Sequence, residues 1–169
     1  MLRNVLTAFA VRGSFVMTAT VLAAATLVPA VSHAAPKTQE VTVKVSRVKL
    51  LDKVDQLSKG DLYLRVTIDG EVVKSAVVKG ADVIKPDWKV SAKVKSGAHI
   101  VKVELVDKDV TQDDSIDINK VDKKRDLDFT VTKGCRIEGF SSPYKCGSSI
   151  TRAGTEVKKA EITFSVSVK

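Results

Sequence analysis

The chain has 169 residues, of which 28 are Lys or Arg and 20 are Asp or Glu, so its net charge is +8. Two histidines and two cysteines offer little material for a zinc site or for a histidine-dependent catalytic set. An excess of Lys suits anionic lipid or polysaccharide as a partner, and it also serves plain solubility.

The first 34 residues have the pattern of a secretory signal peptide. A positively charged start precedes an apolar, Ala-rich stretch over 15–28, and Ser32-His33-Ala34 places small residues where a signal peptidase reads them. The alternative is an uncleaved anchor helix, but Pro29 leaves the apolar run short for a span of about 20 residues. We expect cleavage after Ala34, and a periplasmic or secreted single domain over residues 35–169. Export argues against nucleic acid as the natural partner.

Beyond residue 40 the apolar positions recur with a period of two, which indicates strands rather than helices. The first strand changes phase near Val48, as at a β-bulge, and Asp69-Gly70 is typical of a hairpin turn. Short strands with turns between them predict an all-β fold, an antiparallel eight-stranded β-sandwich. The eight segments are 41–50, 62–68, 71–79, 88–95, 99–105, 115–119, 127–131 and 160–168.

The direction of the strands places the loops. If successive strands reverse, the loop over 51–60, the loop that follows residue 106 and the cysteine-bearing loop over 133–156 share one end of the sandwich. The tight turns, with the charged turn over 120–125, then share the other end. Loops held at one end of a rigid sandwich commonly carry function.

Aspartates concentrate in two of these loops. The stretch 107–114 holds four aspartates in eight residues. The loop over 51–60 and the residue directly after it add Asp55 and Asp61. Carboxylate oxygens are the ligands that calcium prefers, often from separate loops. An EF-hand is excluded, because no Gly stands at its sixth position and Ile118 occupies the place of its bidentate Glu. The alternative is a solvated acidic loop without a metal.

This layout resembles the C-two (C2) domain, the calcium- and phospholipid-binding sandwich of the synaptotagmins and protein kinase C. Three features over residues 41–118 carry the resemblance: two aspartates six apart, a mid-domain Pro-x-Trp at Pro86-Asp87-Trp88, and an Asp-x-Asp that ends a strand. The resemblance implies a calcium site whose ligands are Asp55, Asp61, Asp107, Asp109 and Asp114. Asp113 is the alternative to Asp114 as the last of these ligands.

The chain departs from the family in its last third. The loop over 133–156 has no counterpart in the family, and it carries Cys135 and Cys146. In an exported protein we expect these cysteines to form a disulfide; two free thiols are the alternative. The aspartate loop also lacks a large apolar tip, since Val110 is its one apolar residue.

We therefore expect an exported, non-enzymatic binding domain that coordinates calcium between two aspartate-rich loops. Its partner would be anionic lipid, envelope polysaccharide or another envelope protein. The alternative is a structural or protein-interaction sandwich of the cell envelope with no metal. A hydrolase that uses paired carboxylates is a third reading, but no aromatic cleft for a sugar is evident.

Overall fold

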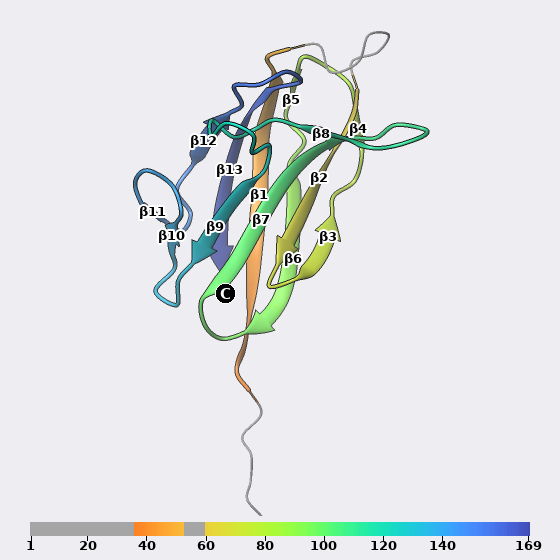
Figure 1. Ribbon diagram of the computed structural model, residues 1–169. Coiled ribbons are helices and arrows are strands. Elements are labelled where there is room, and N and C mark those ends of the chain that lie inside the picture. The colour runs from red at the N-terminus through yellow and green to blue at the C-terminus, as the bar shows by residue number, and fades with distance from the viewer. Residues whose placement is uncertain (1–35, 53–59) are drawn as a thin grey trace, which may run out of the picture. The chain divides into compact units, whose positions relative to one another are not determined.

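The computed structural model describes residues 36–52 and 60–169 and shows two antiparallel sheets packed face to face (Figure 1). The described residues form thirteen strand segments and no helix, which confirms the all-β sandwich. Accordingly, no helix that is long and apolar enough to cross a membrane is found in this part of the chain. The predicted signal peptide and Asp55 lie outside the described residues.

The first sheet is organised around β1 (Thr38–Leu50). On one side β1 pairs with β13 (Ala160–Val168), which in turn pairs with β12 (Ile150–Ala153). On its other side β1 pairs directly with two strands, with β6 (Trp88–Lys95) over most of its length and with the short β5 (Val83–Ile84) near its end. The register with β13 shifts within β1 where the alternation changes phase, so the predicted bulge is confirmed.

The second sheet is organised around β7 (His99–Asp107). Its neighbour on one side is β2 (Asp61–Ile68), paired along seven positions. On the other side β7 pairs with β8 (Asp114–Ile116) at its end and with β9 (Leu127–Val131) at its start. These pairings bring the beginning of β2 beside the end of β7.

Four short strands complete the second sheet. The strand β2 also pairs with β3 (Glu71–Lys74) and, after a break in the strand predicted there, with β4 (Val78–Lys79). Beyond β9 the sheet continues through β10 (Arg136–Glu138) and β11 (Tyr144–Lys145). Each of the eight predicted strands is present. The count of eight is nevertheless too low, because β5, β10, β11 and β12 are too short to show a period.

Alternation along the long strands builds the core between the sheets. On β6 every second residue is buried, beginning with Trp88 at 4% exposure, while its lysines face outward as predicted. The rings of Phe129 and Phe164 stack across the interior with centroids 5.9 Å apart, which joins the two sheets. Removing this apolar surface from water is the main stabilising term in such a fold.

The predicted ends of two loops are wrong. Both β8 and β9 run antiparallel to β7 along the same edge, so the two strands together cross the sheet only once. Val131 therefore lies opposite His99, at the end that carries the tight turns. The cysteine-bearing loop begins at that end, and the turn over 120–125 does not lie there. The strand β12 then returns the chain to the aspartate end.

Candidate functional site

The two aspartate loops meet where β2 begins and β7 ends. Leu62 pairs with Asp107 in the sheet, and the backbone N–H of Asp61 donates a hydrogen bond of 2.7 Å to Oδ1 of Asp107. The Asp107 side chain is only 2% exposed. A carboxylate from one loop is thus bound directly by the backbone of the other, as the convergence of the two loops requires.

Gly60 makes this close approach possible. Its φ is +76°, a conformation that L side chains rarely adopt, and a Cβ there would lie 2.9 Å from Oδ1 of Asp107. Any side chain would therefore push against the carboxylate while it strained the backbone. Glycine is needed here for both reasons.

A lysine from a distant part of the chain lies among the acids. Asp114 is opposite Asp107 in the β7–β8 pair, and its Oδ2 forms an ion pair with Nζ of Lys158. The hydrogen bond from Lys158 to Asp114, with the charges of Asp109 and Asp107, raises the pKa of Lys158 above its usual value against a smaller effect of burial. Lys158 is therefore the counterion of Asp114, and it also feels the charges of Asp107 and Asp109.

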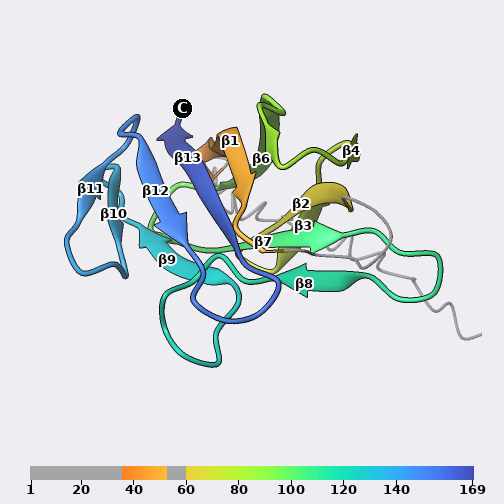
Figure 2. The same cartoon turned by 90° about the horizontal axis from the view of Figure 1, so that it is seen from above.

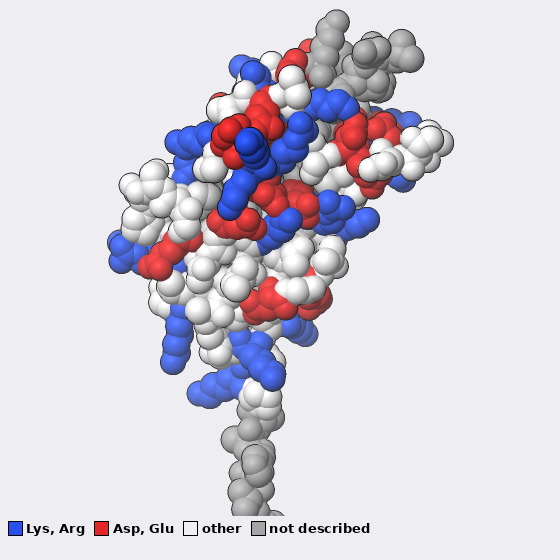
Figure 3. Space-filling model, viewed as in Figure 1, with Lys and Arg blue, Asp and Glu red and all other residues white. Residues whose placement is uncertain are grey.

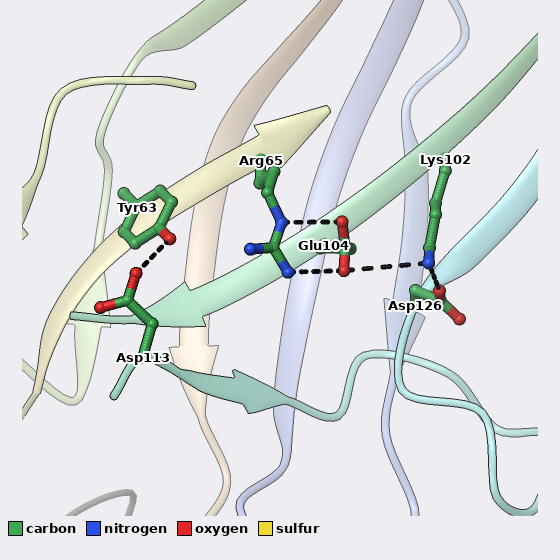
Figure 4. A network of polar contacts seen from close by, with 6 residues as sticks. All are labelled: Tyr63, Arg65, Lys102, Glu104, Asp113 and Asp126. Atoms are coloured by element: carbon green, nitrogen blue, oxygen red, sulfur yellow. Dashed lines mark hydrogen bonds and ion pairs between the residues drawn. The ribbon is translucent and has the colours of Figure 1, made fainter. Parts of the chain in front are cut away.

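Asp113 belongs to a different contact from Asp114. Its Oδ2 accepts a 2.7 Å hydrogen bond from the hydroxyl of Tyr63, on the outer face of β2 (Figure 4). Burial, and then this bond to a carboxylate, raise the pKa of Tyr63 to about 12. The same hydrogen bond lowers the pKa of Asp113. Asp113 thus fastens the aspartate loop to the sheet, while Asp114 lies with Asp107.

Asp61 and Asp109 line a shallow hollow of about 360 Å³ at this end. Lys79 and Lys108 line it too, and the fully exposed Val110 stands at its edge. In the face shown in Figure 3, basic and acidic side chains are interspersed over the upper part of the molecule. The acidic end is therefore balanced by nearby cations.

The chemistry of these residues fits calcium, but their arrangement fits it only in part. Four of the five predicted ligands are described: Asp61, Asp107, Asp109 and Asp114. Within residues 36–52 and 60–169, no three acidic, His or Cys side chains are grouped closely enough to hold a metal ion. An ion at this end would need the Lys158 ammonium to move away from the carboxylates.

Asp117 holds the loop that carries Lys158, and no pattern in the sequence marks it for this role. It is fully buried, and its Oδ2 accepts hydrogen bonds from the backbone of Thr155 at 2.7 Å and Glu156 at 2.8 Å. Its Oδ1 accepts a third, at 2.9 Å, from Asn119. The spacing of Asp117 and Asn119 is a local turn signal, but nothing local points to residues 155 and 156.

Further paired charges cover the outer face of the second sheet. Arg65 donates two hydrogen bonds to Glu104, of 2.9 and 2.8 Å, from neighbouring strands (Figure 4). Nζ of Lys102 donates a hydrogen bond to Oδ2 of Asp126, 2.6 Å away, and this bond raises the pKa of Lys102. Because each of these charged groups already has a partner, we infer that the pairs stabilise the sheet and do not bind a ligand.

The predicted disulfide is present. Cys135 and Cys146 are joined, with their Cα atoms 5.4 Å apart, and the bond closes the hairpin formed by β10 and β11. Among the described residues there is no free cysteine.

Comparison with known proteins identifies the fold. No protein-family model and no curated protein sequence matches the chain. Among solved structures, the first C2 domain (domain A) of plant Extended Synaptotagmin 1 matches 80% of the chain over 97% of its own length, with 11% identity and a TM-score of 0.55. The paired C2 domains, A and B, of Extended-Synaptotagmin 2, calcium bound, match 79% of the chain over 46% of their length, with 17% identity and a TM-score of 0.52.

Human GIVD cytosolic phospholipase A2 matches 80% of the chain, with 16% identity and a TM-score of 0.54. The match covers 17% of that protein, so the chain spans about a sixth of its length. At these identities the likeness concerns the fold and not the activity. The comparisons and the sheet pairing agree with the resemblance seen in the sequence. The chain therefore has the fold of a C2 domain.

Proposed function

We propose that the chain is an exported, non-enzymatic binding domain that holds calcium at its acidic end. The ligands would be Asp61, Asp107, Asp109 and Asp114, with Asp55 from the same loop as Asp61. The observation that carries this proposal is the hydrogen bond from the Asp61 backbone to the Asp107 carboxylate, which joins the two loops. Calcium takes oxygen ligands from separate loops in this way.

Charge explains what the ion would do. Lys158 forms an ion pair with Asp114, and the negative charges of Asp109 and Asp107 also act on its single positive charge. A divalent cation would cancel more of the repulsion among these carboxylates than one ammonium does. Once bound, it would give the end of the sandwich open coordination positions for an anionic partner, such as a lipid headgroup or an envelope polysaccharide. One of the similar structures is described as calcium bound, in agreement with this chemistry.

Thermal unfolding with and without calcium tests the proposal. Calcium bound only to the native state stabilises it, by about 2.7 kcal/mol at one hundred times the dissociation constant. We expect calcium to raise the Tm of the wild type and to leave the Tm of Asp107→Asn/Asp109→Asn unchanged, because the variant lacks two of the ligand carboxylates. The Asn at 107 still accepts the hydrogen bond from the Asp61 backbone, so the contact between the two loops is kept. Asp122→Asn/Asp128→Asn, which changes two exposed acids, is the matched control. No heat and no thermal shift at millimolar calcium in the wild type would exclude this site.

A metal-free binding or structural domain is the second candidate, and Lys158 favours it. The ion pair of Lys158 with Asp114 already supplies a cation to the acidic end. On this reading, replacement of Lys158 destabilises the protein and calcium does not restore the loss. On the calcium reading, the same replacement removes a competitor and tightens calcium binding.

Export is part of the proposal. Apart from the pattern of residues 1–34, the disulfide between Cys135 and Cys146 supports an oxidising compartment. Expression of the full chain in a bacterial host, followed by cell fractionation and N-terminal sequencing, tests it. The expected mature protein lies outside the cytoplasm and begins at Ala35. A cytoplasmic protein that keeps its first 34 residues would contradict export.

A further inference from the structure

A second charged hollow, of about 410 Å³, shares no lining residue with the hollow at the aspartate loops. It is formed between the connection that leads into β9 and the segments on either side of β11. Both ribbon views show β9, β10, β11 and β12 gathered at one side of the sandwich (Figure 2). The residues that matter for the argument are Asn119, Lys120, Lys124, Leu127, Phe140 and Arg152.

Arg152 is a buried cation that has no counterion within residues 36–52 and 60–169. It is 8% exposed, and its guanidinium lies 4.2 Å from the ring centroid of Phe140 and 5.6 Å from that of Tyr144. Within the described part of the chain, its one hydrogen bond is a long one of 3.4 Å from Nη2 to the Tyr144 hydroxyl, and its Nε has no acceptor. No carboxylate among those residues pairs with it.

This arrangement is costly unless an anion completes it. Burial of an unpaired charge is strongly unfavourable, and a cation–π contact offsets only part of this cost. A planar guanidinium held against an aromatic ring has a fixed direction for its remaining N–H donors. Two such donors pointing the same way form a fork that matches the oxygens of a carboxylate or a phosphate. Arg152 is therefore preset to bind an oxyanion.

Two more cations line the hollow. Lys120 and Lys124 form no ion pair with any residue in the ranges that the structure describes. Asn119 fixes the backbone of the turn that carries them, since its Nδ2 donates to the carbonyl of Asp126 and its Oδ1 accepts from the N–H of Val121 at 3.0 Å. Exposed lysines on a fixed turn leave their charges available to a ligand.

One acid, Asp128, also lines the hollow. Together with Arg152 and the two lysines, it gives the lining three positive charges and one negative charge. The net charge of +2 complements a phosphate monoester, which carries a charge near −2 at neutral pH. Leu127 and Phe140 provide an apolar wall for an organic group attached to the phosphate.

The disulfide hairpin builds the aromatic side of this hollow. The bond between Cys135 and Cys146 encloses Phe140 and Tyr144, whose rings are 5.9 Å apart. Gly139, with φ of +117°, lets the hairpin approach β9, since a Cβ there would lie 3.0 Å from the backbone of Phe129. This gives the cysteine-bearing loop, which the C2 resemblance leaves unexplained, a specific role.

We propose that the hollow binds a phosphate monoester, held through Arg152 and the lysines Lys120 and Lys124. The site is separate from the acidic end and does not depend on calcium. The ligand is either a soluble phosphate monoester or a lipid headgroup of the same chemistry. The hollow is large enough for a small organic phosphate.

Calorimetric titration with phenyl phosphate at constant ionic strength tests this site. We expect binding to the wild type and at least a tenfold loss of affinity in Lys120→Gln/Lys124→Gln. Lys89→Gln/Lys93→Gln, which removes the same charge from the exposed face of β6, should bind like the wild type. Arg152→Lys keeps the charge but loses the fork, so it should bind at least fivefold more weakly, with the fold checked by circular dichroism.

Cosedimentation with vesicles identifies the source of the ligand. Phosphatidylcholine vesicles with phosphatidic acid are compared with phosphatidylcholine alone. Binding only to the former, lost in the Lys120/Lys124 variant and kept in the Lys89/Lys93 variant, assigns the ligand to a lipid headgroup. Binding of phenyl phosphate without vesicle binding assigns it to a soluble molecule. The proposal is overturned if neither probe binds, or if both lysine variants lose affinity equally.

Discussion

Replacement of Asp117 by Asn should destabilise the domain strongly although the shape of the side chain is kept. The buried carboxylate accepts three backbone N–H groups, from Asn119 on one oxygen and from Thr155 and Glu156 on the other. An amide offers one acceptor oxygen, so at least one N–H faces an NH₂ group instead. Each buried donor left without an acceptor costs about 1–3 kcal/mol. We therefore expect a loss of about 2–4 kcal/mol.

Urea unfolding followed by the fluorescence of Trp88, the one tryptophan, measures this loss. For a small domain the slope is about 1–3 kcal/mol per molar urea, so the midpoint should fall by about 1–2 M. Asp122→Asn removes the same charge from an exposed position nearby and should change stability by less than about 0.5 kcal/mol. If the two variants unfold at the same urea concentration, the Asp117 carboxylate does not hold the loop that carries Lys158.

Three further predictions concern pH and redox state. The pKa of Tyr63 is raised to about 12 in the folded protein, so its stabilising contribution is complete below pH 10 and is lost as pH rises toward 12; Tyr63→Phe should flatten the pH dependence of stability between about 10 and 12. Partial burial opposes ionisation of Asp69, but hydrogen bonding, led by the His99 ring, lowers the pKa of Asp69. Its contribution is therefore present above about pH 4 and falls below it, and Asp69→Asn should show a smaller acid destabilisation in urea titrations. Cys135→Ser/Cys146→Ser opens a loop of 11 residues and should cost roughly 2–3 kcal/mol by chemical denaturation, whereas no change would show that hairpin contacts alone maintain the loop.

Alternation along the strands was sufficient to predict the sandwich. On β6 and β13 a buried residue recurs at every second position, and such a pattern has one physical explanation, a sheet with one face on the core. The bulge in β1 was visible for the same reason, because the apolar residues change phase there. The turn at Asp69-Gly70 was also predicted, because Asp-Gly is a residue pair that favours such turns. In the structure both residues adopt positive φ.

Strand direction was harder to predict, because it depends on where a strand stops. The strand β8 has three residues and ends partway along β7. Its alternation continues to Ile118, which is buried although it is not in the strand. Counting β8 as a full crossing reversed the predicted ends for everything between it and β12. Length of pairing is a tertiary property that local periodicity does not contain.

The acidic end was predicted in its composition and not in its contacts. Carboxylates close in sequence marked the aspartate loop, and strand counting brought Asp61 beside Asp107. Lys158 and Arg152 gave no comparable signal, because each meets its partners through loops whose paths are set by distant anchors such as Asp117. The sequence therefore pointed to a cation site without showing that a lysine already lies beside it.

Calorimetric titration of calcium into the wild type and Lys158→Gln tests the central claim most directly. One ammonium near the ion costs about 1 kcal/mol in a largely solvated site, so its removal should tighten calcium binding by about fivefold. Lys133→Gln, an exposed lysine elsewhere, should bind calcium like the wild type. Tighter binding in Lys158→Gln alone is the predicted result. A wild type and a Lys158→Gln variant that both release no heat with calcium would contradict the calcium site and leave Lys158 as the permanent cation of the acidic end.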